Sequence, residues 1–449
     1  MHYEKFQDGT IKCIEDEIPF EVPEGWAWCK LNDIYNFIDY RGATPTKITN
    51  GIPLVTAKNV KSGYIDYTID DYISEEEFKE RQQRGISKKG DILFTTEAPL
   101  GNAALADMEK FSAGQRLITF QQYGSKNELI NYVMLMFILS DFFQQQLYVN
   151  KTGSTVAGIK AAILKTLWIP VPPYNEQLRI SNTLKSAINL IDSISKNKEI
   201  LSTSISNTKS KILDLAIRGK LVPQDPNDEP ASVLLERISA EKEELIKQGK
   251  IKRDKKESVI FKGDDNSYYG IHLPDSWNWA SLREIALSIS DGSHNPPPNN
   301  GSGIPLLSAA NINDNSILMN EISRWITNEE WKIENQRTNI EVGDVLLTIV
   351  GSIGRSAVVQ NNNHFALQRS VAVIKPCLIN PLYLMHIVQS PQIQKWLTDN
   401  SKGTAQKGIY LNALSLMIIP IPPLAEQARI VEHIHIAYKQ LDLISNALL

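Results

Sequence analysis

The segment VPEGWAW at residues 22–28 returns as LPDSWNW at residues 273–279. Four further blocks follow in the same order in both halves of the chain, 250 to 253 residues apart. The first block, Gly51-Ile52-Pro53-Leu54-Val55, returns at 303–307, and the second, Gly90-Asp91-Ile92-Leu93, returns at 343–346. The third, Gln115-Arg116, returns as Gln368-Arg369. The fourth, Ile169-Pro170-Val171-Pro172-Pro173 followed by Glu176-Gln177, returns at 419–423 followed by Glu426-Gln427. A repeat with so long a period indicates two copies of one domain rather than a solenoid.

Each copy combines strand and helix signals. Short runs rich in Val, Ile, Thr and aromatics at 51–56, 91–96 and 117–120 predict strands, and the second half carries their counterparts. Helical stretches are expected at about 127–149 and 382–398. The fold class is therefore α+β, a mixed α/β arrangement of two similar domains separated by long helices.

After each Pro-Pro pair the apolar residues take helical spacing, which predicts a helix from Glu176 to about Arg218 and another at the C-terminus. The narrow apolar stripes resemble a coiled-coil seam, so the two helices are expected to pair in an antiparallel coiled coil. The residues assigned to this seam and to partner docking are Leu184, Ile188, Ile191, Ile205, Ile212, Ile430, Ile434, Leu441 and Ile444. A second, charged helix is expected from about Ala231 to Lys247, followed by a basic run that is interpreted as a solvated linker.

Composition predicts a globular cytoplasmic protein. The 449 residues are 42% hydrophobic and 22% charged, with a formal net charge of -4, so the overall charge does not favour nucleic acid. The three cysteines have unrelated spacings, which argues against disulfides and zinc, and no signal peptide or membrane span is expected.

No catalytic motif is visible in the sequence. It contains no phosphate-binding loop and no metal-ligand spacing, and His433 and His435 point to different faces of a helix. The segment Asn295-Pro296-Pro297-Pro298 is similar to the target-base motif of amino-methyltransferases, but the following aromatic residue is missing. We therefore expect no catalytic residues, no metal and no cofactor on this chain.

The whole pattern resembles the specificity subunits of type I restriction–modification systems. The resemblance rests on Pro-x-x-Trp-x-Trp opening each domain, Arg41-Gly42-Ala43-Thr44-Pro45 and Asp291-Gly292-Ser293-His294, the Gly-Asp-x-Leu strands and the closing Pro-Pro-x-x-Glu-Gln-x-Arg-Ile. Its strongest carrier is the stretch from Ile212 through Arg218-Gly219-Lys220-Leu221-Val222-Pro223-Gln224 to Pro226.

The resemblance implies a non-catalytic subunit that reads a bipartite, asymmetric double-stranded DNA site. It implies two target-recognition domains, at 1–175 and 257–424, a helical spacer at 176–256 that sets the gap, and a C-terminal helix at 425–449 that pairs with it. The implied partners are two methyltransferase subunits, which bind S-adenosylmethionine, and two restriction subunits that act as motor and nuclease. No membrane partner is implied.

Polar loop residues at equivalent places in both copies are the candidates for DNA contact, because Arg and Gln side chains match guanine and adenine and Lys suits phosphates. They are Arg41, Thr44, Lys58, Gln115, Arg116, Lys151, Ser154, Ser293, His294, Ser352, Arg355, Gln368, Arg369, Lys402, Thr404 and Lys407. The shared Gln-Arg pair could equally brace a loop, and the four tryptophans are expected in the cores.

Two other functions remain open from the sequence. A self-contained DNA methyltransferase would bind S-adenosylmethionine. A coiled-coil adaptor would leave every DNA duplex unbound.

Overall fold

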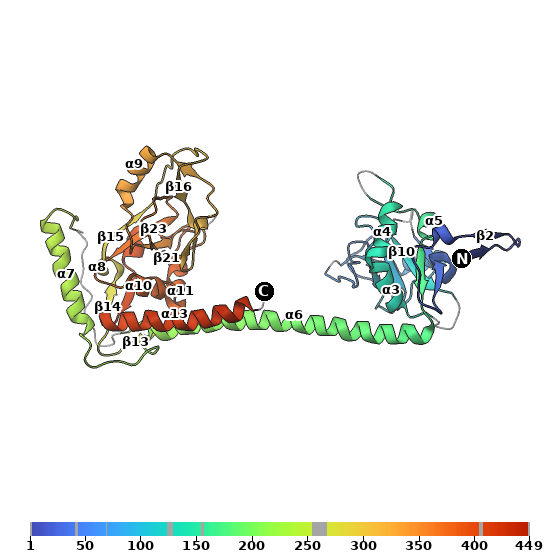
Figure 1. The fold of residues 1–449 in the computed structure, drawn as a ribbon, viewed down its shortest axis with the longest axis horizontal. Coiled ribbons are helices and arrows are strands. Elements are labelled where there is room, and N and C mark those ends of the chain that lie inside the picture. The colour runs from blue at the N-terminus through green and yellow to red at the C-terminus, as the bar shows by residue number, and fades with distance from the viewer. Residues whose placement is uncertain are drawn as a thin grey trace. The chain divides into compact units, whose positions relative to one another are not determined.

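The computed structural model describes residues 2–40, 44–68, 70–123, 129–153, 157–253, 267–403 and 407–447. The chain divides into two compact units, Met1–Ile194 and Ser195–Leu449, whose elements are labelled in Figure 1. Among the helices of the described residues, none has the length and apolar character that crossing a membrane requires.

Unit 1 is built on a four-stranded antiparallel sheet in the order β4-β10-β7-β8, beside a three-stranded sheet in the order β6-β5-β9. The sheet strands are β4 (Tyr35–Asp39), β10 (Leu117–Gln122), β7 (Ile92–Thr95), β8 (Ala103–Leu105), β6 (Tyr72–Ile73), β5 (Ile52–Val55) and β9 (Ser112–Ala113). A hairpin of β1 (Tyr3–Lys5) and β2 (Ile11–Cys13) precedes them. The helices are α1 (Leu31–Ile34), α2 (Glu75–Arg81), α3 (Asn131–Leu139), α4 (Asp141–Val149) and α5 (Ala161–Leu164), with 3-10 turns at Glu15–Glu17 and Gln82–Arg84. The long helix α6 (Tyr174–Ile217) begins in unit 1 and ends in unit 2.

Unit 2 repeats this plan, with one sheet in the order β15-β23-β20-β21 and another in the order β19-β16-β22. Its strands are β15 (Ala286–Asp291), β23 (Val371–Pro376), β20 (Val345–Thr348), β21 (Ser356–Val358), β19 (Trp325–Ile326), β16 (Ile304–Leu307) and β22 (Ala366–Leu367), with small hairpins β12 (Ser267–Tyr268)–β13 (Ile271–His272) and β17 (Ile312–Asn313)–β18 (Ser316–Ile317). The helices are α7 (Ala231–Lys247), α8 (Leu282–Ile285), α9 (Asn328–Thr338), α10 (Pro381–Val388), α11 (Pro391–Asp399), α12 (Leu411–Ser415) and α13 (Leu424–Asn446), with a 3-10 turn at Ala309–Asn311. The expected α+β fold with two similar domains is confirmed.

The two ends of each repeat pair with one another. In unit 1, β3 (Ala27–Lys30) pairs antiparallel with β11 (Trp168–Val171), so that Trp28 lies opposite Pro170. In unit 2, β14 (Asn278–Ser281) pairs in the same way with β24 (Ile418–Ile421). The strand from the tryptophan motif therefore closes each domain against the strand from the proline motif.

A buried glutamine then connects each closing strand to the helix that follows it. The amide oxygen of Gln177 accepts from the backbone N–H of Ile130 at 2.8 Å, and its amide nitrogen donates to the carbonyl of Pro172 at 2.9 Å. Gln427 makes the same two bonds with Asn380 and Pro422, at 2.9 and 3.1 Å. These bonds explain why the Pro-Pro-x-x-Glu-Gln motif occurs in both copies.

The expected long helices at 127–149 and 382–398 are each broken in two, which corrects the prediction. In unit 1, Ser140 separates α3 from α4 and caps α4, since its hydroxyl accepts from the backbone N–H of Phe143. In unit 2 the second helix begins with Pro391. Proline disfavours the helical conformation of the residue before it, here Ser390, and cannot donate to a preceding turn.

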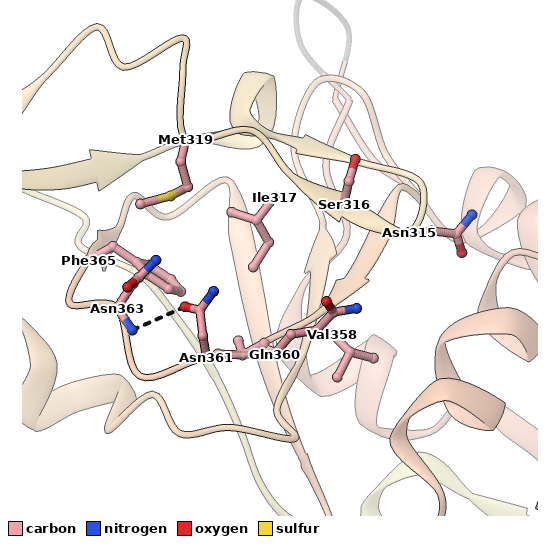
Figure 2. Close-up of a pocket in the computed structure, with 10 residues that line it drawn as sticks. Asn315, Ser316, Ile317, Met319, Val358, Gln360, Asn361, Asn363 and Phe365 are labelled. Atoms are coloured by element: carbon pink, nitrogen blue, oxygen red, sulfur yellow. Dashed lines mark hydrogen bonds between the residues drawn. The ribbon is translucent and has the colours of Figure 1, made fainter.

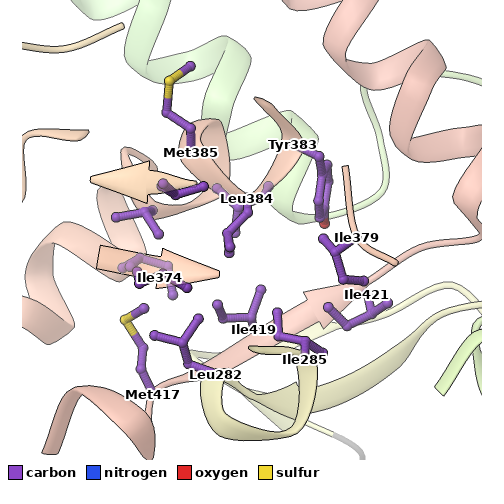
Figure 3. Packing of buried hydrophobic residues seen from close by; sticks show 14 of the residues in the cluster. Leu282, Ile285, Ile374, Ile379, Tyr383, Leu384, Met385, Met417, Ile419 and Ile421 are labelled. Carbon is purple, nitrogen blue, oxygen red and sulfur yellow. The ribbon is translucent and has the colours of Figure 1, made fainter. Parts of the chain in front are cut away.

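The core of unit 2 joins the recognition domain to the helices around it. Figure 3 shows part of this core, with Leu282 and Ile285 of α8 near Ile419 and Ile421 of β24. The same apolar cluster also contains residues of the end of α6, of α7 and of α13. These helices are therefore integral to unit 2 and are not loosely attached to it.

Within unit 2, α13 runs antiparallel to the last turns of α6. The Lys209 ammonium pairs with the Asp442 carboxylate at 2.5 Å, and the hydroxyl of Tyr438 donates to the carbonyl of Lys209 at 3.3 Å. Near the N-terminus of α13, Glu426 accepts a hydrogen bond from the side chain of Gln224, which lies just beyond the C-terminus of α6. The antiparallel pairing of the two helices is confirmed along this stretch.

The seam residues differ widely in burial. Ile430 and Ile434 are fully buried but belong to the core cluster of unit 2, and Ile205 is 8% exposed. Leu184, Ile188, Ile212 and Leu441 are partly buried. Ile191 and Ile444 are 60% and 46% exposed, and α6 also exposes Leu190, Ile194, Ile200 and Leu201. An apolar stripe on α6 thus remains uncovered by the described residues.

Candidate nucleic-acid interface

In unit 1 a tight turn presents the Gln115-Arg116 pair. It lies between β9 and β10, where Gly114 packs so closely that a side-chain carbon would lie 3.2 Å from the Val55 carbonyl oxygen. The backbone carbonyl of Arg116 accepts hydrogen bonds from the backbone N–H and the hydroxyl of Thr96, at 3.1 and 3.2 Å. The backbone of the pair is therefore fixed, while the side chain of Gln115 is partly exposed and that of Arg116 about half exposed.

One pocket brings four of the predicted residues of unit 1 together. Thr44, Lys58, Gln115 and Arg116 all line it. The Thr44 hydroxyl donates to the side-chain oxygen of Gln115 at 3.1 Å. This bond orients the amide so that its NH2 group is left to donate, as an adenine N7 or a phosphate oxygen requires.

Arg116 also has an acidic neighbour that the sequence did not reveal. Its Nε lies 3.0 Å from Oε1 of Glu97, and both side chains are about half exposed. Because the contact uses Nε, the two terminal nitrogens of the guanidinium stay available. An arginine held in this way can offer two parallel donors to a guanine edge.

Lys58 and Lys151 lie on exposed loops of the same unit. Lys58 precedes Asn59, which is buried and whose side-chain oxygen accepts from the backbone N–H of Thr56 at 2.9 Å, fixing the turn. The Lys151 ammonium lies 4.6 Å from the ring centre of Tyr148. Within the described residues neither ammonium has an ion-pair partner, which suits both to phosphate groups.

In unit 2 the equivalent Gln368-Arg369 pair is fixed against a glycine. The backbone N–H of Ser293 donates to the carbonyl of Leu367 at 2.7 Å, and that of Arg369 donates to the carbonyl of Ser293 at 2.9 Å. A side-chain carbon on Gly292 would lie 2.1 Å from the Leu367 oxygen, so only glycine fits there. Ser293 itself is buried, and its backbone N–H and carbonyl make the two bonds that fix the turn.

A second pocket, in unit 2, collects His294, Arg369 and Lys402. Asp291 lies at its base with a 9% exposed side chain, paired with Arg337 and hydrogen-bonded to the His294 ring at 2.8 Å. His294 and Arg337 are therefore held by a carboxylate. Arg369 and Lys402, in contrast, have no ion-pair partner among the residues described.

Val350, Lys402, Gly403 and Gly408 also line the second pocket. The backbone N–H of Gly351 donates to the carbonyl of Lys407 at 3.1 Å, and Lys402 and Gly408 exchange two backbone bonds of 2.8 and 2.9 Å. Ser352, Arg355 and Lys407 are exposed on the same loops but do not line the pocket.

Arg41, Ser154 and Thr404 fall outside the described residues. Another pocket of unit 2, between the β17–β18 hairpin and the segment after β21, is lined by Asn315, Gln360, Asn361, Asn363 and apolar neighbours (Figure 2). None of the predicted DNA-contact residues lines it.

Three neighbours of the predicted residues were not anticipated. Glu97 pairs with Arg116, Arg337 pairs with Asp291, and Lys47 lines the pocket of unit 1 while pairing with Asp71 at 2.6 Å. The two residues of each pair lie in segments far apart in sequence, so no local pattern could have indicated the pairing. Within the described residues no group of three or more His, Cys, Asp or Glu side chains is placed to hold a metal ion.

Known proteins with similar sequences give a consistent identification. The family model described as "Type I restriction modification DNA specificity domain" matches residues 23–202 and 274–448. The specificity subunit of the type I restriction enzyme EcoBI from Escherichia coli is 23% identical over 98% of this chain and 85% of its own length. That of EcoEI, also from Escherichia coli, is 26% identical over 99% of this chain and 83% of its own length.

Solved structures support the same fold. The HsdS subunit from Thermoanaerobacter tengcongensis has a TM-score of 0.52 at 18% identity, covering 96% of this chain and 93% of the other. A chain from a solved type I R-M system has a TM-score of 0.59 at 18% identity, covering 96% and 94%. With two family matches that together span most of its length, this chain belongs to the family of type I restriction modification DNA specificity domains.

Proposed function

We propose that this chain is the sequence-specific DNA-binding specificity subunit of a type I restriction–modification complex. The observation that carries the proposal is the repeated Gln-Arg turn, whose backbone is hydrogen-bonded in both units. Gln115 and Arg116 line a pocket of unit 1, and Arg369 lines a pocket of unit 2. Rigidly held amide and guanidinium groups are the chemistry by which proteins read base edges in the major groove.

The two units contain different side chains at equivalent places, so the proposed site is bipartite and asymmetric. Unit 1 carries Thr44 and Glu97 beside its pair, whereas unit 2 carries His294 and, in the place of Glu97, Val350. Glu97 and Val350 are equivalent because each forms a β-bridge to the glycine, Gly158 or Gly408, that closes the neighbouring loop. Different donors and acceptors select different base pairs, so each unit reads its own half of the site.

The exposed lysines supply the general attraction to DNA. Lys58 and Lys402 line the pockets of units 1 and 2. Lys151 and Lys407 are exposed on other loops of the same units, and none of the four has an ion-pair partner among the described residues. This local arrangement accounts for DNA binding by a chain whose formal net charge is -4.

The proposed partners are two methyltransferase subunits and two restriction subunits, with S-adenosylmethionine bound by the methyltransferase and no catalytic group on this chain. The exposed apolar stripe of α6, with Leu190, Ile191 and Ile194, supports docking of partner helices. Relatives that bear the name specificity subunit give no support to a self-contained methyltransferase or to an adaptor without DNA binding.

Binding to a cognate and a scrambled duplex at several salt concentrations tests the proposal, using the chain assembled with its methyltransferase. Specific binding should exceed binding to the scrambled duplex by at least about 10³-fold, and both should weaken as salt rises. Equal binding to both duplexes would contradict sequence reading. Binding of S-adenosylmethionine by this chain without its partner would contradict the proposed division of labour.

A further inference from the structure

In unit 2 the tryptophan motif holds the loop that follows α6. The indole N–H of Trp277 donates to Oε2 of Glu426 at 2.9 Å, and the side-chain amide of Gln224 donates to Oε1 of the same carboxylate at 2.6 Å. Glu426 and Trp277 are almost completely buried beneath this loop. The carboxylate thus bridges an indole of the domain and an amide of the loop.

Further contacts hold the same loop, which runs from Gly219 to Pro230. Arg429 forms a bidentate ion pair with Asp228. Asp228 follows Gln224 by four residues in the loop. The Ser276 hydroxyl donates to the side-chain oxygen of Gln224 at 3.1 Å, and the backbone N–H of Ala231 donates to the carbonyl of Ser276 at 2.9 Å. Trp277, Glu426 and Arg429 together form a receptor for a segment that brings a glutamine and, four residues later, an aspartate.

Unit 1 contains the same receptor residues, namely Trp26, Glu176 and Arg179. The framework that positions them is also the same. The strand carrying Trp28 pairs with the strand carrying Pro170 in the register of its counterpart in unit 2, and Gln177, beside Glu176, makes the bonds that Gln427 makes. The equivalence therefore extends to the backbone on both sides of the receptor.

The receptor of unit 1 is uncovered, however. The indole nitrogen of Trp26 is buried and donates to no acceptor among the described residues. Glu176 is partly exposed and Arg179 exposed, whereas Glu426 is fully buried. Within the part of the chain that the structure describes, neither Glu176 nor Arg179 has an ion-pair partner.

The neighbouring tryptophan shows that the difference is local. The indole N–H of Trp28 donates to the backbone carbonyl of Phe20 at 3.0 Å. The indole ring of Trp28 also packs edge-on against the Phe20 ring, with 4.9 Å between the ring centres. Among the residues that the structure describes, the N-terminal segment therefore supplies an acceptor to Trp28, whereas Trp26 has none. A buried donor without an acceptor is unfavourable, so a segment that completes the hydrogen bonding gains free energy on binding.

We propose that Trp26, Glu176 and Arg179 form a docking site for a partner protein segment that carries a glutamine and, four residues later, a carboxylate, as the loop Gly219–Pro230 does in unit 2. The partner amide donates to Glu176, whose carboxylate then accepts from Trp26, and the partner carboxylate pairs with Arg179. The occupant is a loop rather than a helix, because Pro223, Pro226 and Pro230 shape the loop that serves as its template.

A labelled peptide with the sequence of residues 218–231 tests this site directly. Its binding to the full chain is followed by fluorescence anisotropy. We expect saturable binding that weakens about tenfold with Arg179→Ala, since an ion-paired hydrogen bond is lost, and about threefold with Trp26→Phe, which removes the indole N–H. The matched control Trp28→Phe, whose indole is already satisfied, should bind as the wild type does.

Two further measurements fix the location. A peptide with Gln224→Ala and Asp228→Ala should bind at least about tenfold more weakly than the parent peptide. A photo-crosslinking version of the parent should attach to the segments around Trp26 and Glu176. Absence of saturable binding, insensitivity to Arg179→Ala, or cross-links confined to unit 2 would each overturn the proposal. Circular dichroism and thermal melting confirm that each variant is folded.

Discussion

Arg116 and Glu97 form an ion pair in unit 1, with Nε and Oε1 3.0 Å apart. At the equivalent place in unit 2, Arg369 and Val350 line one pocket and no carboxylate replaces Glu97. The same arginine is thus restrained in one unit and released in the other. Two domains built on one framework can in this way make different contacts with DNA.

Replacing Arg116 with alanine should abolish the preference at one position of one half-site and leave the other half-site unchanged. A bidentate arginine–guanine pair contributes about 1–3 kcal/mol of discrimination, so cognate affinity should fall roughly five- to a hundredfold. Arg369→Ala is the reciprocal control, because its effect should be confined to the other half-site. Competition among single-base variants of the cognate duplex measures both. Loss of preference in both half-sites with one variant would refute separate reading.

Replacing Glu97 with glutamine should strengthen binding to all sequences and weaken discrimination. The change removes a negative charge near the DNA and releases the guanidinium of Arg116, which can then pair with a phosphate. The slope of log affinity against log salt should become steeper by about one unit. Val350→Ala is the control in unit 2 and should leave this slope unchanged. An unaltered slope in Glu97→Gln would show that Arg116 remains fixed by other contacts.

Replacing Lys58 or Lys402 with alanine should weaken binding to cognate and scrambled duplexes by the same factor. Each lysine is expected to contact a phosphate, so the salt slope should decrease by about 0.9 per residue. Lys12→Ala on the β1–β2 hairpin, where Lys12 pairs with Glu17, serves as the control. A selective loss for the cognate duplex alone would instead assign the lysine to base reading.

Replacing Ile191 with aspartate should prevent assembly with the methyltransferase subunit and leave the fold intact. Ile191 is 60% exposed on α6, so the substitution disturbs no core but places a charge in the proposed helix interface. Asn189→Asp places the same charge on the opposite face of the helix and should assemble normally. Co-purification and size-exclusion chromatography distinguish the two. Normal assembly of the Ile191 variant would move the docking surface elsewhere.

His386 should make unit 2 sensitive to acid. His386 is 7% exposed, and its Nδ1 has no hydrogen-bond partner among the described residues. Burial lowers the pKa of His386 from 6.5 to about 4. The unfolded chain takes up the proton first as pH falls, so stability is full above about pH 6.5 and declines toward pH 4. The difference between pH 7.5 and 4.5 should be about 2–3 kcal/mol.

The matched variant for this prediction is His386→Met, since Met136 occupies the equivalent position of α3 in unit 1. Chemical denaturation at several pH values should show a smaller acid dependence in the variant than in the wild type. Equal acid dependence of the two proteins would assign the loss of stability to other groups.

The repeated blocks were sufficient to predict two similar α+β domains, because each block marks a strand or a closing motif. The Pro-Pro motif ends β11 and β24, and the long helix begins at Tyr174, two residues before the predicted start. The helix breaks at Ser140 and Ser390 were missed because apolar spacing continues across them. There a serine, with proline after the second, overrides the periodicity.

The candidate sites were only partly predictable. Thr44, Lys58, Gln115 and Arg116 were chosen as equivalent loop residues, and the structure gathers them in one pocket. The pairing of Arg116 with Glu97 depends on two loops that meet only in the folded domain. The difference between the two receptors was also beyond the sequence, because Trp26 and Trp277 stand in the same Pro-x-x-Trp-x-Trp motif. Of these two indoles, only that of Trp277 has an acceptor among the described residues.

Selection of bound duplexes from a randomised DNA pool, with this chain assembled on its methyltransferase, tests the central claim most directly. The account predicts enrichment of two short, different sequence blocks separated by a fixed gap, with the Arg116→Ala variant losing a position in one block only. A single contiguous motif, or no enrichment by a properly assembled complex, would contradict two independent reading units.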